Sequence, residues 1–276
     1  MAKNKRMMIE VDPGDGLNRS IVGEWSKEKI EYLVRYVQTS SATRRKWKQY
    51  GRSAFIDLYS GSGRSRIDGT ADEIVDGGVI AAVRQGLQSQ PFDQIVIGDL
   101  DPDLVDAAKQ RLLRLGPLDV TDLGGPAEST VDDAIRAIDP KGLHLAYLDP
   151  FSVHALPFSI IQKLGRVPHI DLMIHFSVLD YRRNLTAMCD NGKMDSVAPG
   201  WQRVITSNMG LEDRRRRIFE HWKGLIESLG YHTSEVVPVA ATGKADYYWL
   251  VLVGKHELIK KFWNVATDTQ TQMSLI

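Results

Sequence analysis

Apolar residues recur every three or four positions in the segment GEWSKEKIEYLVRYV (23–37), which predicts an amphipathic helix. Ser26 is expected to cap its start, because a serine side chain accepts hydrogen bonds from the free amide groups of a first helical turn. A second, more basic helical turn is expected around residues 44–48. Residues 1–20 are polar and rich in glycine and aspartate, and we expect a flexible or loosely docked arm there.

From residue 53 onward, short apolar runs alternate with helical segments. Strands that are apolar on both faces and separated by helices indicate a parallel sheet with helices on both sides. Strands are expected at 53–59, 92–103, 118–120, 143–151 and 170–178, and helices at 77–90, 102–116, 129–138 (with Ser129 as its cap), 156–165 and 211–230.

The C-terminal part departs from this rhythm. Two β-prone runs flank ATGKA (241–245), which predicts an antiparallel hairpin. The expected fold is therefore α/β, a doubly wound seven-stranded Rossmann-like sheet that is parallel with a C-terminal antiparallel hairpin, plus an N-terminal helical extension. That arrangement is the one found in class I methyltransferases.

Composition excludes several classes of protein. The 35 Lys+Arg and 35 Asp+Glu residues balance, so no net field indicates nucleic acid or an acidic membrane. The single cysteine, Cys189, excludes an intrachain disulfide and fits a reducing cytoplasm. The seven histidines lack metal-ligand spacing, His175 is expected to be a satisfied core residue, and no apolar stretch approaches the ~20 residues of a membrane span. We expect a cytoplasmic protein without a metal, and no signal peptide at the basic N-terminus.

The stretch AFIDLYSGSGRSR (54–66) runs from a strand into a glycine-rich turn. A dinucleotide-binding loop needs a helix directly after its glycines, but RSRIDGTADEIVD (64–76) intervenes here. S-adenosylmethionine carries no phosphate, and its ammonium group suits a carboxylate such as Asp57. A plain tight turn is the alternative. The residues expected around the methionine end of this cofactor are Asp57, Tyr59, Ser60, Gly61, Ser62 and Gly63.

Acids at later strand ends extend this hypothesis. Asp99, with Asp101 second, ends the next expected strand, where a carboxylate can accept both ribose hydroxyls of an adenosine cofactor. Leu100 lies between them, and Glu128, after the third strand, is expected near the adenine. The alternative is an ordinary acidic strand end followed by a helix that favours aspartate in its first turn.

The expected fourth strand ends in LAYLDPFS (145–152). This is similar to the [DNS]-P-P-[YFW] motif of amino-methyltransferases, with Phe151 replacing the second proline and Ser152 at the fourth position. The candidate catalytic residues are therefore Asp149, Pro150 and Phe151, with the acid and the aromatic facing the methyl acceptor. The alternative is a proline that ends the strand and a phenylalanine that packs.

Arginines supply candidate substrate contacts. Arg64 and Arg66 lie in the insertion after the glycine loop, which we interpret as a lid or acceptor-facing loop. Arg182 and Arg183 follow the expected fifth strand and suit an anionic or nucleobase-bearing substrate. Trp47 within the basic run 44–48 is a further candidate for contact with nucleic acid.

Several stretches together resemble the three-Cys-motif partner proteins (TcmP), a methyltransferase-like bacterial family. They are GEWSKEKIEYLVRYV, FIDLYSGSGRSR (with Ser60 and Ser62 in place of the usual Ala and Pro), DGGVIAA, LAYLDPF, DLMIHFSVLDYRRN and YYWLVLVGKHELIKKFW, over roughly residues 20–265. The resemblance implies the S-adenosylmethionine methyltransferase fold and a protein partner encoded nearby that carries three cysteines. It does not supply a substrate.

These patterns together predict a domain organisation and a function. We expect an arm (1–20), a helical extension (21–50), a class I methyltransferase-like domain (51–265) and a C-terminal tail (266–276). The function hypothesis is an S-adenosylmethionine-dependent methyltransferase whose acceptor is RNA or DNA. The alternative is a partner or binding protein on the same fold without catalysis, and a nicotinamide-dependent oxidoreductase is disfavoured by the loop.

Overall fold

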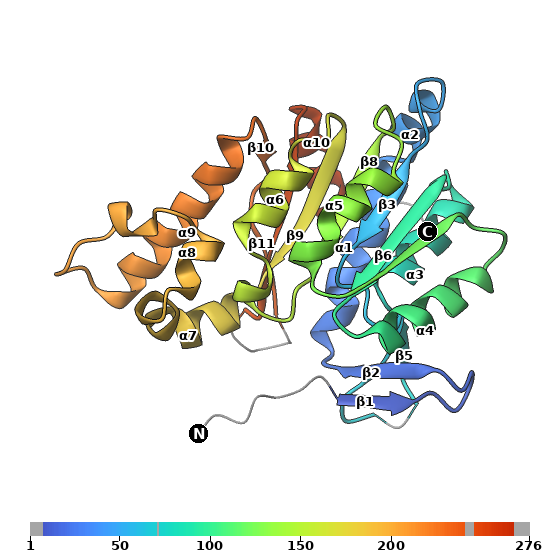
Figure 1. Ribbon diagram of the computed structural model, residues 1–276, viewed down its shortest axis with the longest axis horizontal. Helices are drawn as coiled ribbons and strands as arrows, with labels where there is room; N and C mark the ends of the chain where they lie inside the picture. The colour runs from blue at the N-terminus through green and yellow to red at the C-terminus, as the bar shows by residue number, and fades with distance from the viewer. Residues whose placement is uncertain (1–7, 71, 241–245, 268–276) are drawn as a thin grey trace.

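The centre of the molecule is a twisted, mostly parallel sheet. The computed structural model describes residues 8–70, 72–240 and 246–267. The strands of this sheet are β3 (Ala54–Asp57), β6 (Gln94–Asp99), β7 (Val120–Gly124), β8 (His144–Leu148), β9 (Ile170–Phe176), β10 (His232–Thr233), β11 (Val237–Val239) and β12 (Tyr248–Gly254). They lie in the order β10-β12-β9-β8-β3-β6-β7, with β11 also paired to β12 (Figure 1). Strands β7, β6, β3, β8 and β9 are parallel to one another and β12 is antiparallel to β9, which confirms the expected class I methyltransferase fold.

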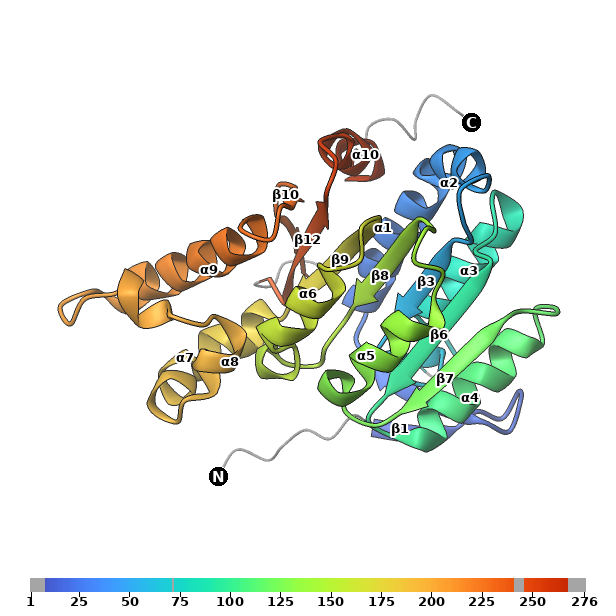
Figure 2. The same cartoon turned by 45° about the horizontal axis from the view of Figure 1, so that its top comes forward.

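Helices cover both faces of this sheet, because its inner strands are apolar on both sides: β3 and β8 are buried at every position. The helices are α1 (Trp25–Thr39), α2 (Ser41–Trp47), α3 (Gly78–Gln88), α4 (Pro102–Leu113), α5 (Ala127–Ala137), α6 (Phe158–Leu164), α7 (Val178–Asp190), α8 (Lys193–Val197), α9 (Leu211–Glu227) and α10 (Leu258–Thr267), with short 3₁₀ turns at Val153–Ala155 and Trp201–Val204. One core joins the sheet to α5, α6 and α9, and the other joins it to α1, α3, α4 and α10. Helices α7, α8 and α9 extend beyond β9 at one side of the molecule (Figure 2).

The N-terminal residues form a second, smaller sheet. Strands β1 (Met8–Val11) and β2 (Asn18–Val22) join β4 (Arg64–Ile67) and β5 (Ile74–Asp76) in the order β1-β2-β4-β5. The expectation of a flexible arm is therefore wrong for residues 8–20, and the insertion after the glycine loop is a hairpin. Because β4 starts at the carboxyl end of β3, this sheet lies beneath the carboxyl edge of the main sheet (Figure 1).

Two expected helix caps are displaced. Helix α1 begins at Trp25, so Ser26 is a buried residue of its first turn, and the Ser26 amide donates to the Gly23 carbonyl (3.0 Å). Helix α5 begins at Ala127 after Pro126, whose ring fixes a φ of −59° that suits entry into a helix. The Ser129 hydroxyl donates back to the Pro126 carbonyl (2.8 Å) from inside the first turn.

The C-terminal hairpin is confirmed by the antiparallel pairing of β11 with β12, whereas its turn, 241–245, lies outside the described residues. Helix α10 crosses the boundary expected at residue 265, and the rest of the expected tail, from 268, is not described. Within the described ranges, no helix has the length and apolar character that crossing a membrane requires.

Candidate functional site

Three acids from separate parts of the chain meet at the carboxyl edge of the main sheet. Asp57 ends β3, Asp99 ends β6, and Asp149 directly follows β8. Strands β6 and β8 flank β3 on its two sides in parallel register, so their ends are adjacent. The structure thus brings together the loop, the strand-end acid and the Asp-Pro-Phe motif that the sequence singled out.

Three backbone amides of the glycine loop already have acceptors within the protein. The Ser60 amide donates to the Gly98 carbonyl (2.9 Å), that of Gly61 to Asp99 Oδ2 (3.0 Å), and that of Gly63 to the Ser60 carbonyl (3.3 Å). A pyrophosphate-binding loop needs such amides free to point at the ligand. This loop therefore lacks the donor set of a dinucleotide site, whereas a cofactor without phosphate does not require it.

Glycine is required at two loop positions. Gly61 and Gly63 have φ angles of +53° and +73°, in the left-handed region that side chains rarely adopt. A Cβ on Gly63 would also lie 2.9 Å from Cγ1 of Ile80 in α3. The start of α3 in fact returns to the loop, since the Gly77 amide donates to the Gly63 carbonyl (2.8 Å). Contrary to what the sequence had indicated, the inserted hairpin thus does not move α3 away from the glycine loop. The argument against a pyrophosphate therefore depends on the hydrogen-bonded amides of the loop.

Asp99 keeps free acceptor capacity at the strand end and its contact with a ribose stays a prediction, whereas Asp101 caps a helix. Asp99 accepts one backbone hydrogen bond on each carboxylate oxygen, from Gly61 and from Asp101 (3.1 Å), which leaves further acceptor capacity on both. Burial raises the pKa of Asp99 and these hydrogen bonds partly oppose the rise. Asp101 Oδ1 caps α4 by accepting from the Asp103 amide (3.0 Å). Leu100 between them is 66% exposed, an apolar surface beside the polar one.

Asp57 is the most buried of the three acids, at 1% exposure. Burial raises its pKa well above the usual range, although the Tyr59 amide, which donates to Asp57 Oδ1 (3.0 Å), opposes this. The Tyr59 hydroxyl donates to the Ala155 carbonyl (2.7 Å), so this side chain joins the loop to the chain after β8. Ser60 and Ser62 are buried in the loop as well.

The third acid has a partner that the sequence analysis missed. Lys29 Nζ, from the second turn of α1, lies 2.5 Å from Asp149 Oδ2 and 5.1 Å from the centre of the Tyr248 ring. The two charged side chains are 12% and 17% exposed. Burial has the largest single effect on the pKa of Lys29 and lowers it, but the attraction and hydrogen bond of Asp149, together with smaller contributions from Tyr248 and Asp57, make the net shift upward. Burial likewise raises the pKa of Asp149, and attraction to Lys29 brings it below the usual range, so both groups are charged.

Aromatic rings surround this ion pair. His175 on β9 is fully buried, with Nδ1 4.0 Å from Asp149 Oδ1 and its ring edge-on to Tyr147 and Tyr248. In the part of the chain that is described, neither ring nitrogen has a hydrogen-bond partner. Burial lowers the pKa of His175 to about 4 despite the nearby carboxylate. The expectation of a satisfied core histidine is therefore wrong, since this side chain is buried and unpaired beside the site.

The Asp-Pro-Phe turn presents its aromatic ring to solvent: Phe151 is 69% exposed. The turn is anchored to α7, because the Val153 amide donates to Asp180 Oδ2 (3.0 Å). Arg182 and Arg183 lie in the first turns of this helix. The Arg182 guanidinium lies 5.7 Å from the centre of the Trp249 ring and Arg183 is exposed.

Glu128 lies in the first turn of α5, where its Oε1 accepts a hydrogen bond from the Ser159 hydroxyl of α6 (2.6 Å). Its contact is thus with the neighbouring helix. The predicted contact of Glu128 with an adenine ring stays a prediction.

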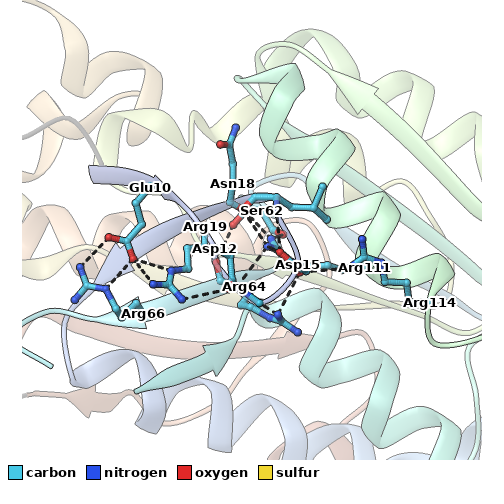
Figure 3. Close-up of polar contacts among 12 residues, drawn as sticks. Glu10, Asp12, Asp15, Asn18, Arg19, Ser62, Arg64, Arg66, Arg111 and Arg114 are labelled. Carbon is cyan, nitrogen blue, oxygen red and sulfur yellow. Dashed lines mark hydrogen bonds and ion pairs between the residues drawn. The ribbon is translucent and has the colours of Figure 1, made fainter. Parts of the chain in front are cut away.

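Ion pairs tie the N-terminal hairpin to the glycine loop (Figure 3). Arg111 of α4 is 4% exposed, donates to both carboxylate oxygens of Asp15 (2.8 Å each), and donates to the Ser62 carbonyl of the loop (2.7 Å). Arg64 pairs with Asp15 (3.2 Å) and Arg66 with Glu10 (2.7 Å). Both guanidinium groups thus hold the N-terminal strands, where we expected them to face substrate.

Two residues of the basic segment 44–48 have contacts that join parts of the fold. Arg44 is buried and donates to the carbonyls of Val37 (2.7 Å) and Gln90 (3.1 Å). Trp47 Nε1 donates to the Lys141 carbonyl (2.9 Å), in the turn before β8. This segment therefore lies at the amino edge of the sheet, opposite the three acids, and its predicted contact with nucleic acid stays a prediction.

Among the described residues, no group of three or more His, Cys, Asp or Glu side chains is arranged to hold a metal ion. No protein-family model matches the sequence. No curated protein matches it either.

Solved structures with similar arrangements include methyltransferases. Trm1 from Pyrococcus horikoshii, in complex with S-adenosyl-L-methionine, has a TM-score of 0.46 and 12% identity over 81% of this chain and 54% of its own. An O-methyltransferase from Bacillus cereus, in complex with SAH, has a TM-score of 0.47 and 12% identity over 83% and 82%. Protein LPL1258 from Legionella pneumophila has a TM-score of 0.49 and 9% identity over 88% and 92%. The strand order itself carries the conclusion about the fold.

Proposed function

We propose that this protein binds S-adenosylmethionine at the carboxyl edge of its main sheet and transfers the methyl group to an acceptor beside Phe151. The observation that carries the proposal is the internally bonded glycine loop next to Asp57 and Asp99. Asp57 suits the ammonium group of the cofactor, the free lone pairs of Asp99 suit the ribose hydroxyls, and exposed Leu100 suits the adenine.

When bound, S-adenosylmethionine supplies a methyl group activated by a sulfonium. The chain's own residues then have to align the acceptor, exclude water and accept or orient a proton. Asp149 is the carboxylate for the proton, and Phe151 offers an exposed ring on which a flat acceptor can stack. Arg182 and Arg183, two and three residues after the Asp180 anchor, support an anionic or nucleobase-bearing acceptor, and we propose RNA or DNA.

Calorimetry tests the binding. S-adenosylmethionine and S-adenosylhomocysteine are expected to bind, and Asp99→Ala is expected to abolish most of that binding. Asp103→Ala, which removes an exposed acid from the same region, is the control and should bind as the wild type does. If neither ligand gives a binding heat at concentrations up to the millimolar range, the proposal is refuted.

Labelling identifies the acceptor. Purified protein and a labelled methyl donor are incubated with total RNA, DNA and protein extract, and we expect label in a nucleic-acid fraction that is lost with Phe151→Ala. If the label appears in the protein fraction instead, the acceptor is a protein and the proposal of a nucleic-acid acceptor is wrong.

The TcmP resemblance leads to a finer proposal: a cytoplasmic member of that family, working with a neighbouring protein that carries three cysteines. A non-catalytic partner on this fold is the second candidate, because Lys29 occupies the carboxylate assigned to the acceptor. Two results would favour an enzyme over a non-catalytic partner: an adenosine ligand that copurifies with the protein, and transfer of the labelled methyl group to a substrate.

A further inference from the structure

The pairing of Lys29 with Asp149 places one cation and two carboxyl groups at the same end of the site. Lys29 reaches the sheet from α1 and its Nζ lies 2.5 Å from Asp149 Oδ2, which follows β8, the strand beside the one that ends in Asp57. The amino-acid end of S-adenosylmethionine carries one ammonium, which suits a carboxyl group of the protein, and one carboxylate, which suits a lysine. The cluster is therefore complementary in charge to the amino-acid end of the proposed cofactor.

A structural role alone does not account for the position of Lys29. Lysine is rarely buried, and replacing a buried ion pair by apolar residues is often neutral or stabilising. Here the lysine lies beside the Tyr248 ring and the Asp149 carboxylate, and the two charged side chains keep 12% and 17% exposure. The pair is therefore reachable from solvent at the edge where the glycine loop lies.

We propose that Lys29 is the residue that binds the α-carboxylate of the cofactor, and that it leaves Asp149 to do so. This inference rests on the proposed function. The structure pairs Lys29 with Asp149. When the ammonium of the ligand lies beside Asp57, its carboxylate takes Lys29, and Asp149 becomes free to accept a proton from the acceptor. Donor binding thereby prepares the acceptor side of the site.

The test compares two ligands by calorimetry on the wild-type protein: S-adenosylhomocysteine and its decarboxylated analogue, which lacks only the carboxylate. We expect the analogue to bind roughly tenfold to a hundredfold more weakly, the equivalent of one charge-assisted hydrogen bond. In Lys29→Met both ligands should bind with the weaker affinity, so that their ratio falls to about one. Equal affinities in the wild type, or a ratio unchanged in Lys29→Met, would overturn the inference.

Two variants secure the comparison. Lys27→Met removes a half-exposed lysine of the same helix, which pairs with Glu73 just before β5, and it should preserve the ratio. Lys29→Met leaves the Asp149 carboxylate without its cation and is at risk of unfolding. In that event Lys29→Met with Asp149→Asn removes both charges, and its ratio is again expected near one. Absence of any S-adenosylhomocysteine binding by the wild type would refute the proposed function, whereas binding without discrimination would refute only the role of Lys29.

Discussion

At the scale of single residues, a carboxyl group as buried as that of Asp57 is costly to ionise, yet the proposed ammonium partner needs it ionised. Its pKa is raised in the folded protein, mainly by burial, so the native state holds a proton that the unfolded chain releases. The free energy of unfolding of the wild type therefore falls as pH rises from the ordinary pKa of an aspartate towards the raised pKa of Asp57. Asp57→Asn, which cannot ionise, is expected to increase the free energy of unfolding at pH 8 by about 1–3 kcal/mol.

Urea unfolding at pH 5 and pH 8 checks this expectation, together with calorimetry of S-adenosylhomocysteine. The Asp57→Asn variant should gain stability over the wild type from pH 5 to pH 8 and should bind the ligand at least tenfold more weakly. A variant that gains no stability at pH 8, or that binds normally, contradicts the assigned role.

Residue positions at strand ends were predictable, whereas contacts across elements were not. Asp57, Asp99 and Asp149 could be placed because parallel strands present their carboxyl ends at one edge. Lys29 was missed although a signal existed: it lies four residues before buried Leu33, on the apolar face of α1. A charged residue on such a face needs a buried partner, but which strand supplies it depends on how the helix packs.

At the scale of elements, Arg111 joins α4, the N-terminal hairpin and the glycine loop. Removing it leaves Asp15, whose pKa the Arg111 guanidinium lowers to about 2, buried without its main partner. Arg111→Met is therefore expected to cost about 3–5 kcal/mol in the free energy of unfolding. Amide exchange should accelerate in residues 8–22, and ligand affinity should fall because the Ser62 carbonyl loses its donor.

Arg114→Met is the matched control for that variant. Arg114 follows the same helix and pairs with the same aspartate at 3.5 Å, but its side chain is 51% exposed. Exposed pairs contribute about 0–1 kcal/mol, so this variant should resemble the wild type. Equal effects of the two substitutions would show that the hairpin does not depend on the buried guanidinium.

The same network explains why one element was mispredicted. The main strands and helices follow from apolar periodicity, which the sequence shows directly. Strand β1 exposes its apolar side chains, and the N-terminal hairpin is held by arginines about 45–100 positions away, Arg64, Arg66 and Arg111. No local pattern reports such partners, and a segment rich in glycine and aspartate then resembles a loose arm.

At the scale of the whole molecule, the two edges of the main sheet have different roles. The carboxyl edge gathers the acids and Lys29. The amino edge carries buried polar contacts between segments: the Tyr36 hydroxyl donates to Asp171 (2.6 Å), and His144 Nδ1 accepts from the Ala54 amide (3.1 Å). These contacts join α1 to β9 and β8 to β3, so their loss should reduce stability without altering the site.

His144 tests this division through pH. Burial lowers its pKa to about 4, below the value of 6.5 for an unperturbed histidine, so the folded protein keeps it neutral. Its contribution to stability is therefore complete above pH 6.5 and is lost as the pH falls towards 4. His144→Asn should destabilise the protein at pH 7, and the difference from the wild type should shrink by about 2 kcal/mol at pH 5. Urea unfolding at the two pH values measures this, with exposed His256→Asn as the control. Ligand affinity at pH 7 should stay at the wild-type value; a loss of binding in His144→Asn would show that the two edges are coupled.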